Sequence, residues 1–264
     1  MISVKILVFV KQVPDTVDVK IDPATGNICR EGIQSVINPY DANAIEAALC
    51  LKEKLGATVA AVSMGPPQAM DVLNYALGMG CDECYLLSDR AFGGADTLAT
   101  GYALSKAAEK IGDYDLLIFG KCATDAETAQ TGPIVAEFLD IPQVTLVDKL
   151  DVEDGWAVCR RDLGSSFQTV KAKLPALVTV TAEINNPRYP SARGIMTRGR
   201  KPHYTWTAEE AGCDTNRTGG KGSPSVNKKI FAPPKHSTDT QYFSGEPEEI
   251  AKAFVDALES EKII

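Results

Sequence analysis

The most restrictive feature of this sequence is a regular alternation of short apolar runs with amphipathic segments over its first two-thirds. Predicted strands cover residues 4–10, 58–63, 85–88 and 115–119; predicted helices cover 41–55 and 96–111, with others beginning at Gly65 and near Thr131. Because strands and helices at this spacing form βαβ units, we predict an α/β fold with a mostly parallel sheet. Ligands of such sheets bind beyond the carboxyl ends of the strands.

The alternation of predicted strands and helices ends near residue 144. Short strands are predicted at 144–152, 156–161, 167–172 and 176–182. No helix intervenes between them, so we expect antiparallel hairpins at the edge of the sheet.

The C-terminal part of the chain has little periodicity. Residues 208–247 are rich in Gly, Pro, Ser, Thr and Asn, and we interpret them as an arm lying on a partner. A final amphipathic helix is predicted at 247–262. We therefore divide the chain into an α/β domain, 1–190, and a segment of loop and arm, 191–264.

Charge and composition exclude several classes. With 27 Lys and Arg against 35 Asp and Glu, the net charge of -8 argues against nucleic-acid binding. No apolar stretch has the length of a membrane span, and the run 6–10 is too short for a signal peptide. Seven scattered cysteines indicate free thiols in a reducing, cytoplasmic setting, and two histidines disfavour a His-rich metal site. The pair Cys81 and Cys84 precedes a strand instead of opening a helix, so we interpret it as structural and not as a redox motif.

The strongest local motif is the loop 120–133, GKCATDAETAQTGP, between a strand and an apolar helix. Proline is tolerated only in the first turn, so Pro133 places the start of the helix near Thr131. A helix N-terminus binds phosphate through free N–H groups, which makes the loop either a nucleotide-phosphate cradle or an ordinary βα loop. Neither a P-loop nor the G-x-G-x-x-G fingerprint occurs, so a conventional NAD-binding domain is disfavoured.

Two further segments are candidates. Asn-Pro-Tyr-Asp at 38–41 opens the first predicted helix, and Asp41 taken alone is interpreted as an N-cap. The stretch 185–201 contains five basic residues and no acid. It is either a solvated basic face or a patch for an acidic partner or a cofactor phosphate, and its interleaved apolar residues favour a protein interface.

Together these segments resemble the β subunit of electron-transfer flavoproteins. The resemblance rests on VKQVPD (10–15), NPYDANAIEAALCLKE (38–53), AVSMGPPQA (61–69), ALGMGCDECYLL (76–87), LLIFGKCATDAETAQTGPIVAEFLDIPQVT (116–145), LPALVTVTAEINNPRYPS (174–191) and GIM (194–196). It implies a Rossmann-like domain of the adenine-nucleotide-binding type whose residues 191–264 clasp a larger, FAD-carrying α subunit. The nucleotide of the β subunit is AMP in the respiratory branch and a second FAD in the electron-bifurcating branch.

The resemblance also implies a set of nucleotide contacts. They are Phe9, Asn38, Pro39, Tyr40, Asp41, Met64, Gly120, Lys121, Cys122, Ala123, Thr124, Asp125, Ala126, Glu127, Thr128, Ala129, Gln130 and Thr131. The N–H groups around 128–131 would hold phosphate. The flavin does the chemistry in such a protein, so no catalytic side chain is expected.

VKQVPDT and ETAQTGP resemble the bifurcating members, although Ala126 stands where their loop has glycine. In that branch the FAD of the β subunit takes a hydride from NADH. One electron goes to ferredoxin and the other, through the α-subunit FAD, to a flavin dehydrogenase, a reaction of anaerobic metabolism. The alternatives are a respiratory-type β subunit with structural AMP and a stand-alone adenine-nucleotide-binding protein, against which the long arm argues.

The resemblance places the partner-recognition loop at Arg188, Tyr189, Ala192, Arg193, Ile195 and Met196. The family has a leucine anchor for acyl-CoA dehydrogenases at the place of Ala192. Loss of such an anchor costs about 2 kcal/mol. Either the partner is a different flavin dehydrogenase, for example one acting on a hydroxy acid, or docking uses other contacts; our hypothesis is a different partner.

Overall fold

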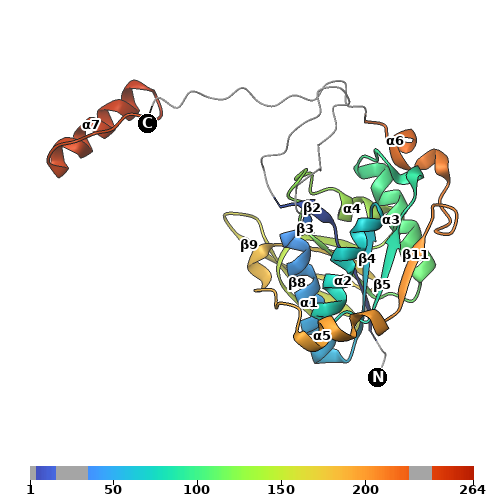
Figure 1. The fold of residues 1–264 in the computed structure, drawn as a ribbon. Helices are drawn as coiled ribbons and strands as arrows, with labels where there is room; N and C mark the ends of the chain where they lie inside the picture. Colours follow the sequence, from blue (N-terminus) through green and yellow to red (C-terminus); the bar gives the residue numbers. More distant parts are fainter. Residues whose placement is uncertain (1–3, 16–34, 226–239) are drawn as a thin grey trace. The chain divides into compact units, whose positions relative to one another are not determined.

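The computed structural model describes residues 4–15, 35–225 and 240–264, which fall into two compact units, Met1–Lys229 and Ile230–Ile264. The first unit contains a nine-stranded sheet with the strand order β11-β5-β4-β1-β6-β10-β7-β8-β9 (Figure 1). The strands are β1 (Lys5–Phe9), β4 (Thr58–Met64), β5 (Glu83–Leu87), β6 (Leu116–Gly120), β7 (Gln143–Glu153), β8 (Trp156–Asp162), β9 (Phe167–Lys173), β10 (Ala176–Val180) and β11 (His203–Trp206). A small antiparallel sheet pairs β2 (Gln12–Pro14) with β3 (Ser35–Ile37).

The helices cover both faces of the large sheet. They are α1 (Pro39–Leu55), α2 (Met70–Met79), α3 (Thr97–Ile111), α4 (Thr131–Phe138), α5 (Ala192–Thr197) and α6 (Gly219–Gly222). Alternate residues of β1 face opposite layers, as the pleat requires. Ile6 and Val8 pack with α1 and α2, and Leu7 and Phe9 pack with α3 and α4. The predicted α/β class with a mostly parallel sheet is thus confirmed.

Two features of the sheet differ from the sequence-based expectation. β7, β8 and β9 form the predicted antiparallel hairpins, but β10 pairs parallel with both β6 and β7 and lies inside the sheet. β8 and β9 continue the sheet beyond β7, and the chain then returns so that β10 occupies the position between β6 and β7. β11 was not predicted. It pairs parallel with β5 and forms the other edge.

Residues after 190 contribute to the first unit. β11 completes the sheet, and Ala208 and Ala211 pack into the α3 and α4 layer. Residues 208–225 therefore fold onto the α/β body, whereas the sequence suggested an irregular arm from residue 208. The division at residue 190 and the clasping role of 191–264 stay predictions.

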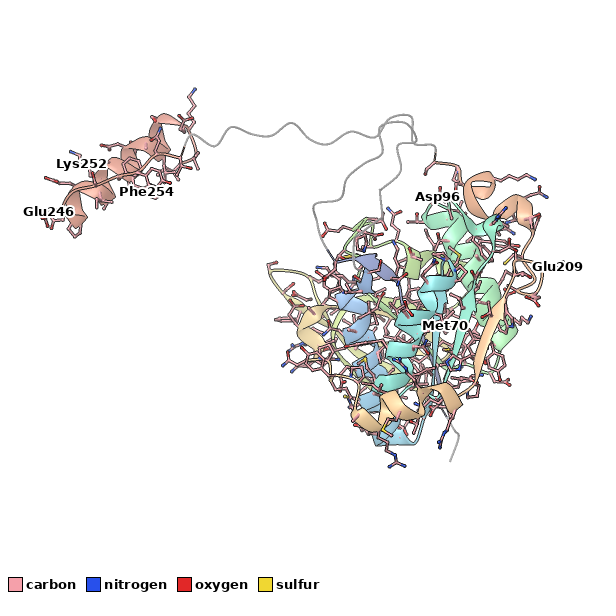
Figure 2. All side chains as sticks on the ribbon, viewed as in Figure 1. Met70, Asp96, Glu209, Glu246, Lys252 and Phe254 are labelled. Atoms are coloured by element: carbon pink, nitrogen blue, oxygen red, sulfur yellow. The ribbon has the colours of Figure 1, made fainter. Side chains whose placement is uncertain are left out.

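The second unit contains α7 (Pro247–Ser260), which confirms the predicted final helix. A capping box joins Glu246 and Glu249 at its start, and the rings of Phe243 and Phe254 pack edge to face. Figure 2 shows Lys252 and Phe254 on this helix. Phe254 remains half exposed, so the apolar stripe of α7 is uncovered within the described part of its unit. No helix among the described residues is long and apolar enough to cross a membrane.

Cys81 and Cys84 are structural. Both side chains are fully buried, and burial raises the pKa of each thiol to about 12. A thiol with such a pKa stays protonated near neutral pH and is a poor nucleophile.

Candidate functional site

The candidate site lies where the direction of chain winding reverses. From β1 the chain continues to β4 and β5 on one side, and then crosses to β6 on the other side of β1. The connection after β1 leads to α1 on one face, and the connection after β6 leads to α4 on the opposite face. The two loops therefore separate at the carboxyl ends of neighbouring strands, and this separation creates the crevice in which open α/β sheets bind ligands.

Aromatic and thioether groups form the floor of this crevice. The rings of Phe9 and Phe119, at the ends of β1 and β6, stack with centroids 4.2 Å apart. Met64 ends β4 and packs partly buried against the same layer. The three strand ends selected from the sequence thus lie side by side.

Asn38 connects the two loops of the crevice. Its side chain is fully buried and does not cap α1. Instead, its Nδ2 donates to the carbonyl of Cys122 at 2.9 Å, and its Oδ1 accepts from the N–H of Thr124 at 3.2 Å. One amide therefore fixes the path of the loop after β6.

Asp41 has a different role from the predicted N-cap. α1 begins at Pro39, because proline suits the first helical position, so Asp41 lies inside the first turn. Its carboxylate accepts from the N–H of Lys11 at 2.8 Å and of Gly120 at 3.2 Å. Asp41 thus ties the ends of β1 and β6 to α1. Burial raises the pKa of this carboxyl to about 7, despite the N–H groups that favour the anion.

This buried carboxyl predicts an unusual pH dependence of stability. Because its pKa rises from 3.8 to about 7 on folding, the native state holds a proton that the unfolded chain releases between these values. Stability therefore falls as pH rises through this window, by roughly 4 kcal/mol. The variant Asp41→Asn cannot ionise at this position. Denaturant unfolding of nucleotide-free protein from pH 4 to 8 should show the fall in the wild type and not in the variant; parallel profiles would contradict it.

Gly120 is required by close packing. A Cβ on this residue would lie 2.5 Å from Oδ1 of Asp41 and 2.7 Å from the Tyr40 backbone carbon. The next residue, Lys121, holds its Nζ 5.0 Å from the centre of the Tyr40 ring. The first turn of α1 and the start of the loop are therefore in contact, with a cation over an aromatic face.

The loop continues as an open cradle. Lys11 Nζ pairs with Asp125 at 2.7 Å, which links the loops of β1 and β6 again. Glu127 and Ala129 have φ angles of 50° and 54°, in the left-handed region, where L residues cost about 1 kcal/mol each. Ala126, which replaces the glycine of the resembling loops, has no positive φ, so the strain lies on its neighbours.

The cradle ends at the N-terminus of α4, which begins at Thr131 as predicted. Gln130 provides no side-chain cap. Among the described residues, the backbone N–H groups from 128 to 132 have no acceptor. Five successive free donors at a helix N-terminus are suited to a phosphate group.

The predicted partner segment, residues 185–201, packs against α1 and α2. Arg188 is not a free charge: its Nε donates to buried Glu46 at 2.8 Å, and its guanidinium also pairs with Glu53. Burial of Glu46 opposes ionisation, but these hydrogen bonds outweigh it and lower the pKa of Glu46. Asn43 and Asn185 exchange hydrogen bonds beside this cluster.

The rest of the segment is fastened to α2. A Cβ on Gly194 would lie 2.0 Å from the carbonyl oxygen of Gly78, so the two backbones are in contact. Lys201 Nζ donates to the carbonyls of Leu77 and Cys81. Of the basic stretch, Arg188 and Lys201 therefore serve the fold.

The other members of the predicted recognition loop face solvent. Tyr189 is 87% exposed and Met196 is 82% exposed, with Ile195 half exposed. Ala192 and Arg193 are also exposed.

Three residues with structural roles at these sites were not found from the sequence: Lys11, Asn43 and Glu46. Their partners lie far away along the chain, and no local pattern marks them.

The chain is similar in sequence to known proteins over most of its length. Residues 25–211 match the model of the electron transfer flavoprotein domain. The chain is 46% identical over 262 residues to the electron transfer flavoprotein subunit beta of Thermoanaerobacterium thermosaccharolyticum, covering 98% of this chain and 99% of that one. It is 42% identical over 261 residues to the caffeyl-CoA reductase-Etf complex subunit CarD of Acetobacterium woodii, covering 98% of this chain and 100% of the relative. It is 38% identical over 260 residues to protein FixA of Bradyrhizobium diazoefficiens, covering 96% and 90%. The chain therefore belongs to the electron transfer flavoprotein family and is a β subunit of that family.

Proposed function

We propose that this chain is the β subunit of an electron-bifurcating electron transfer flavoprotein and that it holds an FAD in the crevice at the ends of β1 and β6. The main support is the row of free N–H groups from 128 to 132 at the N-terminus of α4. A pyrophosphate needs several such donors, and the helix dipole adds to them. A similarity to a subunit of a caffeyl-CoA reductase-Etf complex favours this branch.

The side chains of the crevice bind and orient in this proposal. Asn38 and Asp41 keep the cradle open by holding its backbone, and the stacked rings of Phe9 and Phe119 provide an apolar floor. Lys121 places a positive charge beside the nucleotide. The bound flavin would supply the redox chemistry, by accepting a hydride from NADH and passing electrons to ferredoxin and to the FAD of the α subunit.

The partners follow from the family. Its β subunits pair with an α subunit and with redox partners. We propose that residues 191–264 contribute to the α-subunit contact. Tyr189, Ala192, Arg193, Ile195 and Met196 would contact a cytoplasmic flavin dehydrogenase, acting on an acyl-CoA or a hydroxy acid.

The alternative is a respiratory-type subunit with structural AMP, since the same N–H groups fit a single phosphate. Anaerobic titration of the purified heterodimer with NADH separates the two. If the chain holds a flavin that NADH can reach, flavin absorbance bleaches at stoichiometric NADH. A heterodimer whose flavin stays oxidised with excess NADH, but is reduced by dithionite, would contradict the bifurcating function.

A further inference from the structure

A basic groove lies on the α3 and α4 face, outside the nucleotide crevice. Its volume is about 360 Å³, and it is lined by α3, the end of α4 and residues 216–224. Leu98, Tyr102 and Phe138 form its apolar wall, and Arg217 and Lys221 are its charged groups. α3 and α6 lie side by side here, as Figure 1 shows.

The Arg217 guanidinium is pre-oriented by aromatic packing. Its Cζ lies 4.1 Å from the centre of the Tyr102 ring and 5.5 Å from that of Phe138. The rings of Tyr102 and Phe138 are themselves packed edge to face. A guanidinium stacked in this way loses little further freedom on pairing, and its planar fork matches a carboxylate.

The side chains that line the groove carry positive charge only. No acidic residue lines it, and among the described residues Arg217 takes part in no ion pair. The neighbouring carboxylates accept backbone hydrogen bonds outside the lining: Asp96, labelled in Figure 2, caps α3, and Asp214 caps the turn Thr215–Arg217. Lys221 pairs only with the neutral side chain of Asn216. In a chain of net charge -8 this arrangement favours an acidic occupant.

The groove and the exposed recognition residues lie on opposite faces of the sheet, so they can serve different partners, the α subunit and a dehydrogenase. The exposed recognition residues Tyr189 and Met196 belong to the segment packed on α1 and α2, which cover one face of the sheet. The groove is built on α3 and α4, which cover the opposite face. A dehydrogenase docked at Tyr189 and Met196 leaves this second face for the α subunit.

We propose that this groove docks an acidic segment of the α subunit, with Arg217 and Lys221 pairing with its carboxylates and with Leu98 and Phe138 receiving apolar side chains. The proposal rests on subunit pairing, which family membership supplies. It does not depend on whether the crevice holds FAD or AMP.

Charge reversal tests the proposal in the purified heterodimer. Arg217→Glu combined with Lys221→Glu should raise the Kd for the α subunit about tenfold or more, measured by sedimentation over a dilution series. Lys221→Glu alone, which disturbs no aromatic packing, should give a smaller rise. The difference from wild type should shrink at about 0.5 M NaCl, because salt screens the pairs. The matched control is Lys171→Glu on the exposed side of β9, which should leave the Kd unchanged.

Chemical acetylation of lysines gives a second readout without a variant. Lys221 should react more slowly than exposed Lys171 in the wild-type heterodimer. Unchanged Kd values in both groove variants, with Lys221 acetylated as fast as Lys171, would overturn the proposal. It would also be overturned if the variants weakened only the reduction of a dehydrogenase and left the subunit Kd intact.

Discussion

Gly120→Ala is expected to empty the nucleotide crevice. The new methyl group would overlap the backbone of Tyr40, which belongs to α1, and Oδ1 of Asp41, a buried carboxylate held by hydrogen bonds, so neither can easily move away. The start of the loop must shift, and with it the hydrogen bonds that Asn38 makes to 122 and 124. Overpacking of this kind costs about 2–3 kcal/mol of folding stability.

The measurement is the nucleotide content of the purified heterodimer, together with its unfolding free energy. Gly120→Ala should lose most of its bound nucleotide from the β subunit. Gly199→Ala is the matched control, because a Cβ there has no neighbouring atom within 4 Å. Full nucleotide occupancy in the Gly120 variant would show that the nucleotide binds outside this crevice.

Arg188→Ala is expected to destabilise the protein because it leaves the carboxylate of Glu46 without its ion-pair partner. Glu46 is nearly buried, and its charge is balanced by the Nε and Nη2 donors of Arg188. Removing one partner of a buried pair leaves an uncompensated charge, which costs about 2–3 kcal/mol here, since Arg188 is itself partly exposed. In a Glu46→Gln background the same change should cost less than about 1 kcal/mol, because no buried charge remains.

Denaturant unfolding of the four members of this cycle measures the coupling. Arg200→Ala, an exposed change in the same basic stretch, should leave stability within about 0.5 kcal/mol of the wild type. An equal loss for Arg188→Ala in both backgrounds would mean that Glu46 is not its partner. Arg188 would then be available for the partner dehydrogenase, as the sequence suggested.

Much of the fold could be predicted from local patterns. The buried strands β1, β4 and β6 are apolar runs, and α1 and α3 follow amphipathic periods. The order of strands is a global property: β10 reads like another hairpin strand, yet it fills the position between β6 and β7. β11 was missed because it is short and mostly exposed, so it lacks a buried pattern.

The candidate site shows the same limit. The start of α4, where we propose that phosphate binds, followed from Pro133 and from the strand before it. The roles of Asn38 and Asp41 did not, because their partners lie far along the chain: 84 positions for Asn38 and Cys122, and 30 and 79 positions for Asp41 with Lys11 and Gly120. The sequence suggested an N-cap role for Asp41 and a recognition loop for Arg188, and it showed neither the hydrogen bonds of Asp41 to Lys11 and Gly120 nor the ion pairs of Arg188.

The crevice between the β1 and β6 loops is proposed to hold an FAD. The most direct test is the release of all noncovalent nucleotides from the purified heterodimer by denaturation, followed by quantification. The bifurcating function predicts two FAD and no AMP per heterodimer. One FAD and one AMP per heterodimer would contradict it and would assign this β subunit to the respiratory type.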